Sequence, residues 1–328
     1  MPDYKAIHGK NIQHLASDLD SAEGEGQIWF NTTSGDFKTI VKVAGAWATG
    51  GNLNRDALYA AGTVGGGSNS SALAFGGYIT AAVDNTELYD GSSWTEVNDL
   101  NTARYGAGGR GTTTAALCFG GTPGSGRAGE TEKFDGTNWT ESGDLNTDRY
   151  RMAGAGTQTA ALAAGGENAD GDGVDVVESY NGTSWSEIAD LNTARNGLCG
   201  GGTTTAALAF GGESTAVVAI AESWNGTAWS EVGDMNTGRM RLASADTSAT
   251  DLIAIAGGPP NTAKTESYDG SSWTEVADLS APRHALGSAG TSTSALAFGG
   301  EPPADPWSGG DATEEWDKSV AAVTFTSS

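Results

Sequence analysis

Short apolar runs recur along the chain between small and polar segments, and each run ends in two glycines. The six copies are Leu73–Gly77, Leu117–Gly121, Leu162–Gly166, Leu208–Gly212, Ile253–Gly258 and Leu296–Gly300. A continuous apolar run of this length, bounded by turn-forming residues, is typical of a buried β-strand. Because no 3.6-residue periodicity appears within these copies, the pattern predicts strands and not helices.

Each apolar run belongs to a longer unit that is marked by tryptophan. The markers are Trp47, Trp94, Trp139, Trp185, Trp229 and Trp273, at intervals of 44 to 47 residues. Between the apolar run and the next tryptophan lies a Glu-x-aromatic-Asp or Asn segment, usually followed by glycine, and such an Asp-Gly or Asn-Gly pair is a strong hairpin signal. A Gly-rich segment follows an arginine ten residues after the tryptophan. The unit therefore has four short segments that we expect to be four strands.

Four strands per unit at a period near 45 residues predict an all-β fold, a β-propeller with six blades. The sixth copy is incomplete, since Asp317 is followed by Lys318 and not by glycine. Trp47–Asn54 has the sequence of a fourth strand without the first three, and we expect it to pair with the C-terminal blade and close the ring. Such closure leaves no open sheet edge. Ser319–Ser328 also has a strand-like sequence, and it competes for this role or adds an outer strand.

The repeated order of Gly-Gly, Glu-x-Tyr-Asp and Trp resembles the kelch repeat, the blade motif that also builds the central domain of galactose oxidase. The resemblance covers roughly residues 47–317. It implies a kelch-like propeller, which we place in residues 47–328, preceded by an N-terminal arm and β-hairpin in residues 1–46.

The arm has a strand pattern of its own. Gln27–Asn31 and Phe37–Val43 predict two strands around the turn at 32–36. Together with Ala6–Lys10, this Glu-Gly-Gln-aromatic-Asn region resembles the N-terminal regions of tail-fibre and other virion proteins of tailed bacteriophages. The resemblance implies attachment to other virion proteins of tail or capsid, and we expect the anchoring side chains to be Ile7, His8, Trp29, Phe30 and Phe37.

The charge of the chain restricts its partners. Lysine and arginine number 17 and aspartate and glutamate 41, so the formal net charge is −24. Repulsion argues against nucleic acid or an anionic membrane as partner. No apolar run is long enough to insert into a membrane, and residues 1–20 lack the apolar core of a signal peptide. Because the phage resemblance implies a virion protein and no signal peptide is visible, we expect assembly in the host cytoplasm, and we also expect a homo-oligomer.

The repeated charged residues are poor candidates for chemistry. An active site needs one constellation, whereas the repeat Glu and Arg occur in every unit, so we expect them to pair with each other or with the blade backbone. The chain has three histidines, His8, His14 and His284, two of them in the arm, which does not support a copper site like that of galactose oxidase. No cofactor is otherwise indicated.

One acidic loop resembles a calcium-binding loop. Asn168, Asp170 and Asp172 match the first ligand positions, with Asp175 close behind, but Ser179 stands where a bidentate glutamate is expected. The loop is either a solvated acidic loop or a weak Ca²⁺ site.

The clearest functional signal is variation within the repeat. The loop between the second and third strand differs in every unit, and these loops should emerge on one face of the propeller, where a rigid scaffold commonly presents binding residues. The candidate ligand-binding residues on them are Tyr78, Arg127, Glu167, Glu213, Lys264 and Trp307. Drift in unconstrained surface loops is the alternative interpretation.

Together these patterns predict a non-enzymatic virion protein, a tail fibre, adhesin or decoration protein. It would be anchored by its N-terminus and would use the variable face to bind a host-surface glycan. Two alternatives stay open. A propeller enzyme that processes glycans, a glycosidase or an oxidase, is the first, and a cellular kelch adaptor is the second.

Overall fold

The computed structural model describes residues 13–15, 28–42, 45–56, 59–62, 67–303, 310–318 and 320–324, and these form two compact units. One unit comprises Met1–Gly45 with Lys318–Ser328, and the other comprises Ala46–Asp317. The described residues contain strands and turns but no helix, and therefore no helix that is long and apolar enough to cross a membrane.

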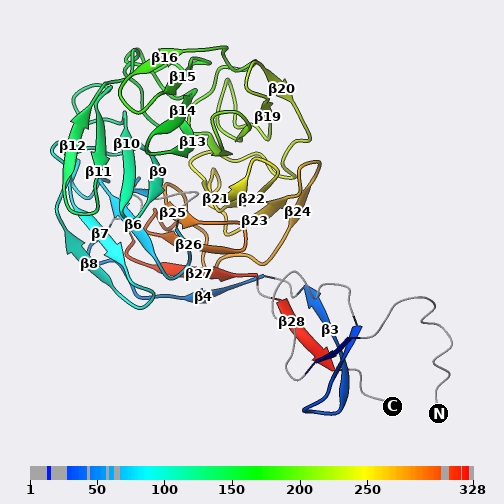
Figure 1. The fold of residues 1–328 in the computed structure, drawn as a ribbon. Coiled ribbons are helices and arrows are strands. Elements are labelled where there is room, and N and C mark those ends of the chain that lie inside the picture. The colour runs from blue at the N-terminus through cyan, green and yellow to red at the C-terminus, as the bar shows by residue number, and fades with distance from the viewer. Residues whose placement is uncertain are drawn as a thin grey trace. The chain divides into compact units, whose positions relative to one another are not determined.

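The larger unit consists of four-stranded antiparallel sheets, and in all but the last of those described the neighbouring strands are consecutive in sequence (Figure 1). The first two sheets are β5 (Ala61–Gly62), β6 (Ala72–Phe75), β7 (Thr86–Tyr89) and β8 (Trp94–Val97), then β9 (Gly108–Thr112), β10 (Ala115–Phe119), β11 (Thr131–Phe134) and β12 (Trp139–Ser142). The next two are β13 (Ala153–Thr157), β14 (Ala160–Ala164), β15 (Val177–Tyr180) and β16 (Trp185–Glu187), then β17 (Cys199–Gly202), β18 (Ala207–Phe210), β19 (Ala221–Trp224) and β20 (Trp229–Glu231). The last two are β21 (Ala243–Ser248), β22 (Asp251–Ile255), β23 (Thr265–Tyr268) and β24 (Trp273–Glu275), then β25 (Gly287–Gly290), β26 (Ser294–Phe298), β27 (Thr313–Asp317) and β4 (Ala46–Thr49).

The sheets are arranged around a common centre, to which each contributes its first strand (Figure 1). These inner strands contact one another in a closed cycle of β5, β9, β13, β17, β21 and β25, in which β25 returns to β5. The predicted all-β propeller fold is confirmed.

The last sheet of the larger unit joins two distant parts of the chain. Strand β4 pairs with β27, with Trp47 opposite Trp316, and the two indole rings lie 5.3 Å apart. The segment that begins at Trp47 therefore supplies the missing fourth strand. Val320–Thr324, called β28, pairs instead with β3 (Asp36–Lys42) in the smaller unit. Residues 318–328 thus belong with the N-terminal unit, and the extent of 47–328 predicted for the propeller is too long at its C-terminal end.

The smaller unit is a sheet in the order β1, β2, β3 and β28. The predicted hairpin is present, since β2 (Ile28–Asn31) pairs antiparallel with β3, and β1 (Gln13–Leu15) adds a parallel strand to β2. The Trp29 side chain is fully buried, and the rings of Phe30 and Phe37 pack at 5.2 Å. Burial makes Trp29 a core residue of this sheet. We expected its side chain to contact a virion partner, but the side chain is not exposed.

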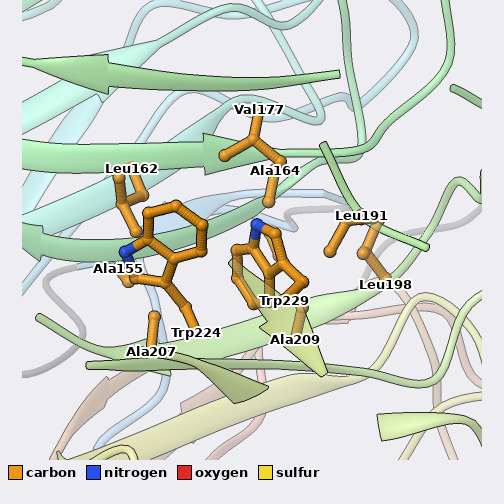
Figure 2. Packing of buried hydrophobic residues seen from close by; sticks show 11 residues of the cluster. Ala155, Leu162, Ala164, Val177, Leu191, Leu198, Ala207, Ala209, Trp224 and Trp229 are labelled. Atoms are coloured by element: carbon orange, nitrogen blue, oxygen red, sulfur yellow. The ribbon is translucent and has the colours of Figure 1, made fainter. Parts of the chain in front are cut away.

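The repeated tryptophans fill the spaces between neighbouring blades. Figure 2 shows one such core, in which Trp224 and Trp229 of one blade pack against Leu162 and Val177 of the preceding blade. The indole N–H of Trp185 donates to Thr131 Oγ1 at 2.9 Å, and Trp139 makes the same bond to Thr86 at 3.1 Å. The tryptophans therefore bind one blade to the next through both packing and a hydrogen bond.

The repeat arginine and glutamate form buried ion pairs that hold the segment leading into a blade against the third strand of that blade. Arg195 Nη2 lies 2.8 Å from Glu222 Oε1, and Glu222 Oε2 also accepts the backbone N–H of Asn192 at 2.7 Å. Arg149 and Glu178 pair in the same way at 2.9 Å. These residues have the scaffold role that their repetition predicts, because their charges are satisfied inside the structure.

Candidate functional site

A ring of backbone hydrogen bonds surrounds one end of the central channel. It is formed by the residue two positions after each repeat arginine and by Tyr59 in the first blade. Each N–H donates to the carbonyl of the preceding ring residue at 2.7 to 3.2 Å, through Tyr59, Gly106, Arg151, Gly197, Arg241 and Ala285, and Tyr59 closes the cycle by donating to Ala285. The mouth of the channel is therefore a rigid frame, since every blade contributes to one hydrogen-bonded cycle.

Three ring positions carry large side chains in an unfavourable backbone conformation. Tyr59, Arg151 and Arg241 have φ values of 53°, 56° and 53°, whereas Gly106 at the equivalent position has 62°. The left-handed region costs a residue with a Cβ about 1–2 kcal/mol, and glycine adopts it freely. Strain of this kind is concentrated at binding and catalytic sites, so these three side chains are candidates for function.

Tyrosine rings gather beside the ring. Tyr105 lies 5.9 Å from Tyr59, 5.1 Å from Tyr78 and 6.4 Å from Tyr150, measured between ring centroids. The guanidinium of Arg151 lies over the rings of both Tyr59 and Tyr150, at 4.8 and 4.4 Å. Tyrosine presents a flat apolar face and a polar hydroxyl, a combination common at binding surfaces.

Two arginines share one carboxylate at this mouth. Glu167 forms an ion pair with Arg127, and its other oxygen lies 3.7 Å from Arg151 Nη1. Arg127 lies over the Tyr150 ring at 4.0 Å, and Arg151 Nη2 donates to the Tyr59 hydroxyl at 3.0 Å. Burial raises the pKa of Tyr150 to about 12 and also raises the pKa of Tyr59. Both phenols are therefore neutral hydrogen-bonding groups at physiological pH.

A second polar group lies on the other side of the mouth. His284 Nε2 is 3.3 Å from Arg241 Nη1 and 3.7 Å from Glu301 Oε2. Burial, supported by the neighbouring Arg241 and Arg151 charges, lowers the pKa of His284 although Glu301 opposes the shift. The imidazole is therefore neutral at pH 7.

A cavity of about 120 Å³ lies inside the ring, lined by Tyr59, Arg151 and Arg241 together with inner-strand residues such as Ser244 and Ser288. This volume holds a few water molecules or one small polar group of a ligand. A larger ligand would have to lie on the mouth and insert only one substituent.

A buried ion pair crosses the channel below the cavity. Arg110 on β9 and Asp246 on β21 are 2% and 4% exposed, and Arg110 Nη1 lies 2.9 Å from Asp246 Oδ1. The pair needs glycine on its path, because a Cβ at Gly154 would lie 3.0 Å from Arg110 Nε and one at Gly201 would lie 2.9 Å from Asp246 Cβ. The channel is thus closed by charged side chains and not left open.

The structure brings three of the six predicted binding residues to this mouth. Tyr78 joins the tyrosine group, and Arg127 and Glu167 form the ion pair described above. Glu213 is half-buried and pairs through its backbone with Asn196. Lys264 lies away from the mouth, with Nζ 2.7 Å from Glu275 Oε2 on the outer strand β24. The predicted residues Trp307, Ile7 and His8 lie outside the described residues.

The acidic loop does not gather calcium ligands. Asn168 Oδ1 accepts the backbone N–H groups of Asp170 and Asp172, both at 3.0 Å, so it closes a turn. The backbone carbonyl of Asp175 accepts a hydrogen bond from the N–H of Leu191. Among the residues that the structure describes, no group of three or more His, Cys, Asp or Glu is placed to hold a metal ion. The predicted calcium ligands therefore do not converge.

Sequence reasoning missed the residues nearest the channel. Tyr59, Arg151, Arg241, Arg110 and Asp246 lie at the start of or within first strands, where we expected only scaffold. The signal that could have found them is departure from the repeat. Arg151 and Arg241 stand where other units have Gly106 and Gly197, and Asp246 stands where they have glycines such as Gly202.

No protein-family model and no curated protein matches the sequence. A solved structure, that of YjhT, is similar with a TM-score of 0.67 and 13% identity over 84% of this chain and 100% of that chain. YjhT is a kelch-like β-propeller, and at this identity the similarity shows the β-propeller fold and carries no information on activity.

Proposed function

We propose that this chain is a non-enzymatic virion protein of a tailed phage, anchored by its N-terminal unit, which binds a host-surface glycan at the channel mouth. The observation that carries the proposal is the gathering of Tyr59, Tyr78, Tyr105 and Tyr150 on a rigid ring of hydrogen bonds. Aromatic faces with hydroxyl and guanidinium groups between them suit sugars, which have apolar ring faces and polar edges.

The rigidity of the mouth supports a binding role. The ring fixes the backbone of Arg151 and Arg241, and the cation–π contacts hold Arg151 between two tyrosines. Because these side chains are already ordered, a ligand would lose little of its binding free energy to ordering them. Variable loops contribute Tyr78, Arg127 and Glu167, so ligand preference can change without change to the scaffold.

The carboxylates at the mouth do not favour the enzyme alternative. Glu167 is occupied by two arginines, and Glu301 faces His284. A glycosidase of the usual kind needs two carboxyl groups that flank the scissile bond, one of them able to give a proton to the leaving group. Neither glutamate is placed in such a pair by these contacts.

The resemblance of residues 6–38 to phage virion proteins supports the anchoring role. The N-terminal unit is a compact sheet that is built from both ends of the described chain, β1 to β3 and β28. A separate folded unit of this kind can be held in a particle while the propeller presents its mouth.

Two measurements test the proposal. The full-length chain is applied to a glycan array, with Tyr105→Ala as the test variant and Lys264→Ala as a control away from the mouth. Binding that falls about two- to tenfold in Tyr105→Ala and not in Lys264→Ala supports the site, since one aromatic contact is worth about 0.5–1.5 kcal/mol. Turnover of a glycan, or a particle map in which the N-terminal unit contacts no virion protein, would overturn the proposal.

A further inference from the structure

The mouth holds cationic hydrogen-bond donors that are only partly paired, in a chain whose net charge is −24. Arg127 and Arg151 share the Glu167 carboxylate, and the Glu301 carboxylate faces His284. The Nε atoms of Arg127, Arg151 and Arg241 are buried and have no hydrogen-bond partner among the described residues. Unpaired cationic donors in so acidic a chain point to an anionic ligand.

Arg241 is the least satisfied of the three arginines. Its contacts in the described residues are His284 Nε2, 3.3 Å from Nη1, and the face of Tyr59, 5.9 Å from the guanidinium carbon. No carboxylate lies within ion-pair distance of Arg241 in the described part of the chain. The strained φ of 53° nevertheless holds this side chain at the cavity.

His284 provides a second donor without an acceptor. A neutral imidazole that accepts from Arg241 at Nε2 carries its proton on Nδ1. The residue is 8% exposed, and its Nδ1 has no partner among the described residues. A buried donor that lacks an acceptor costs about 1–3 kcal/mol, which an anionic ligand would recover.

Building on the proposed glycan-binding function, we propose that the mouth recognises one oxyanion group of an acidic saccharide, a carboxylate or a sulfate ester. Arg241 and His284 bind the oxyanion, and the tyrosines contact the sugar ring. Arg241 lines the cavity of about 120 Å³, whose volume admits such a group, and His284 contacts Arg241 at 3.3 Å. Charge-assisted hydrogen bonds from a guanidinium to an oxyanion are about twice as strong as neutral ones.

The test uses isothermal titration of the full-length chain with three oligosaccharides of one length: neutral, uronic-acid-containing and sulfated. We expect an acidic oligosaccharide to bind at least about tenfold more tightly than the neutral one. The ratio of the two acidic affinities identifies the source of the oxyanion. Equal affinity for all three would overturn the oxyanion inference and leave the glycan-binding function standing.

Two variants locate the site. Arg241→Gly uses the residue that two other ring positions already carry, so the fold is retained, and Lys264→Ala removes an equal charge away from the mouth. We expect Arg241→Gly to lose at least about tenfold in affinity for the acidic oligosaccharide and Lys264→Ala to lose less than about twofold. Equal losses in the two variants would mean that general charge, and not this site, attracts the ligand.

A measurement without saccharide separates the inference from the proposed function. Acetate or inorganic sulfate is titrated while the imidazole resonances of His284 are followed by NMR. A saturable shift that is absent from Arg241→Gly supports the oxyanion site even if no oligosaccharide binds, in which case the glycan function fails alone. No shift and no preference for acidic saccharides would overturn the inference, with the cavity inside the ring then holding water only.

Discussion

Arg110 and Asp246 form a buried ion pair across the centre of the propeller, with 2.9 Å between Nη1 and Oδ1. They belong to β9 and β21, which stand three places apart in the cycle of inner strands and therefore on opposite sides of the channel. Arg110 also donates to the carbonyls of Gly154 and Gly200 on the two strands between them, and Gly202 donates its N–H to Asp246 Oδ2 at 2.7 Å. One side chain thus joins four blades.

Removal of one partner of this pair should be costly. Arg110→Ala and Asp246→Gly each introduce the residue type that equivalent strands carry, as at Ala155 and Gly202, yet each leaves one buried charge uncompensated. We expect each single variant to lose about 3–5 kcal/mol in free energy of unfolding. The measurement is urea denaturation of the full chain.

The double variant Arg110→Ala with Asp246→Gly distinguishes pairing from packing. Because both charges are gone, we expect it to lose less free energy of unfolding than the sum of the single losses, with a coupling energy of about 1–3 kcal/mol. Additive losses would show that the two charges act independently.

Val177→Thr should stabilise the propeller. The indole N–H of Trp229 is buried without an acceptor in the described residues, and its ring points toward Val177 (Figure 2). Other blades place threonine at this position, as where Thr131 accepts from Trp185 at 2.9 Å. We expect Val177→Thr to raise the free energy of unfolding by about 1 kcal/mol and Thr131→Val to lower it by about 1–3 kcal/mol. Denaturant midpoints measure both, and a loss of stability in Val177→Thr would contradict this account.

Arg241→Gly should improve stability while it impairs binding. Glycine relieves the left-handed strain at a φ of 53°, and the lost contacts, one to His284 and a long one to Tyr59, are weak. We expect a gain of up to about 1 kcal/mol in free energy of unfolding. Calorimetry of the unliganded parent chain and variant measures this gain in free energy of unfolding. Lower stability would mean that the Arg241 contacts outweigh the strain.

His284 should make stability depend on pH. Burial lowers its pKa in the folded chain below the ordinary value of 6.5. The unfolded chain therefore takes up this proton first as the pH falls. The contribution of neutral His284 to the free energy of unfolding is complete above about pH 6.5. This contribution declines with falling pH until the pKa of His284 in the folded chain has been passed. The slope is at most about 1.4 kcal/mol per pH unit.

His284→Asn tests this dependence, because Asn196 occupies the equivalent position in another unit. Urea denaturation between about pH 8 and about pH 5 should show a smaller decline for the variant than for the parent chain. Parallel profiles would assign the pH dependence to other groups.

The scaffold could be predicted from sequence because its signals are local and repeated. Each buried strand, each Asp-Gly or Asn-Gly hairpin and each tryptophan recurs in register, so errors in one copy are corrected by the others. The strand that completes the last sheet could not be decided, since 47–54 and 319–328 both have strand patterns. Packing of Trp47 on Trp316 and a 3.3 Å hydrogen bond from Trp47 to Thr265 distinguish the first in the structure.

The site was only partly predictable. Loop variation identified Tyr78, Arg127 and Glu167, but it also identified Lys264, whose side chain turns to the outer strand. Arg151 and Arg241 were missed because their replacement of the repeat glycine was not used as a signal. Their convergence on the Tyr59 ring depends on closure of the ring of blades, which no single repeat contains.

The pairings of β4 and β28 make the folding of both units depend on the order of synthesis. The propeller sheet of β27 and β4 and the N-terminal sheet of β3 and β28 each join an early segment to one made nearly three hundred residues later. Pairings so distant along the chain form slowly. Neither sheet can be completed until residues 313–324 have left the ribosome. A truncated translation product would therefore lack both a closed propeller and a finished N-terminal sheet.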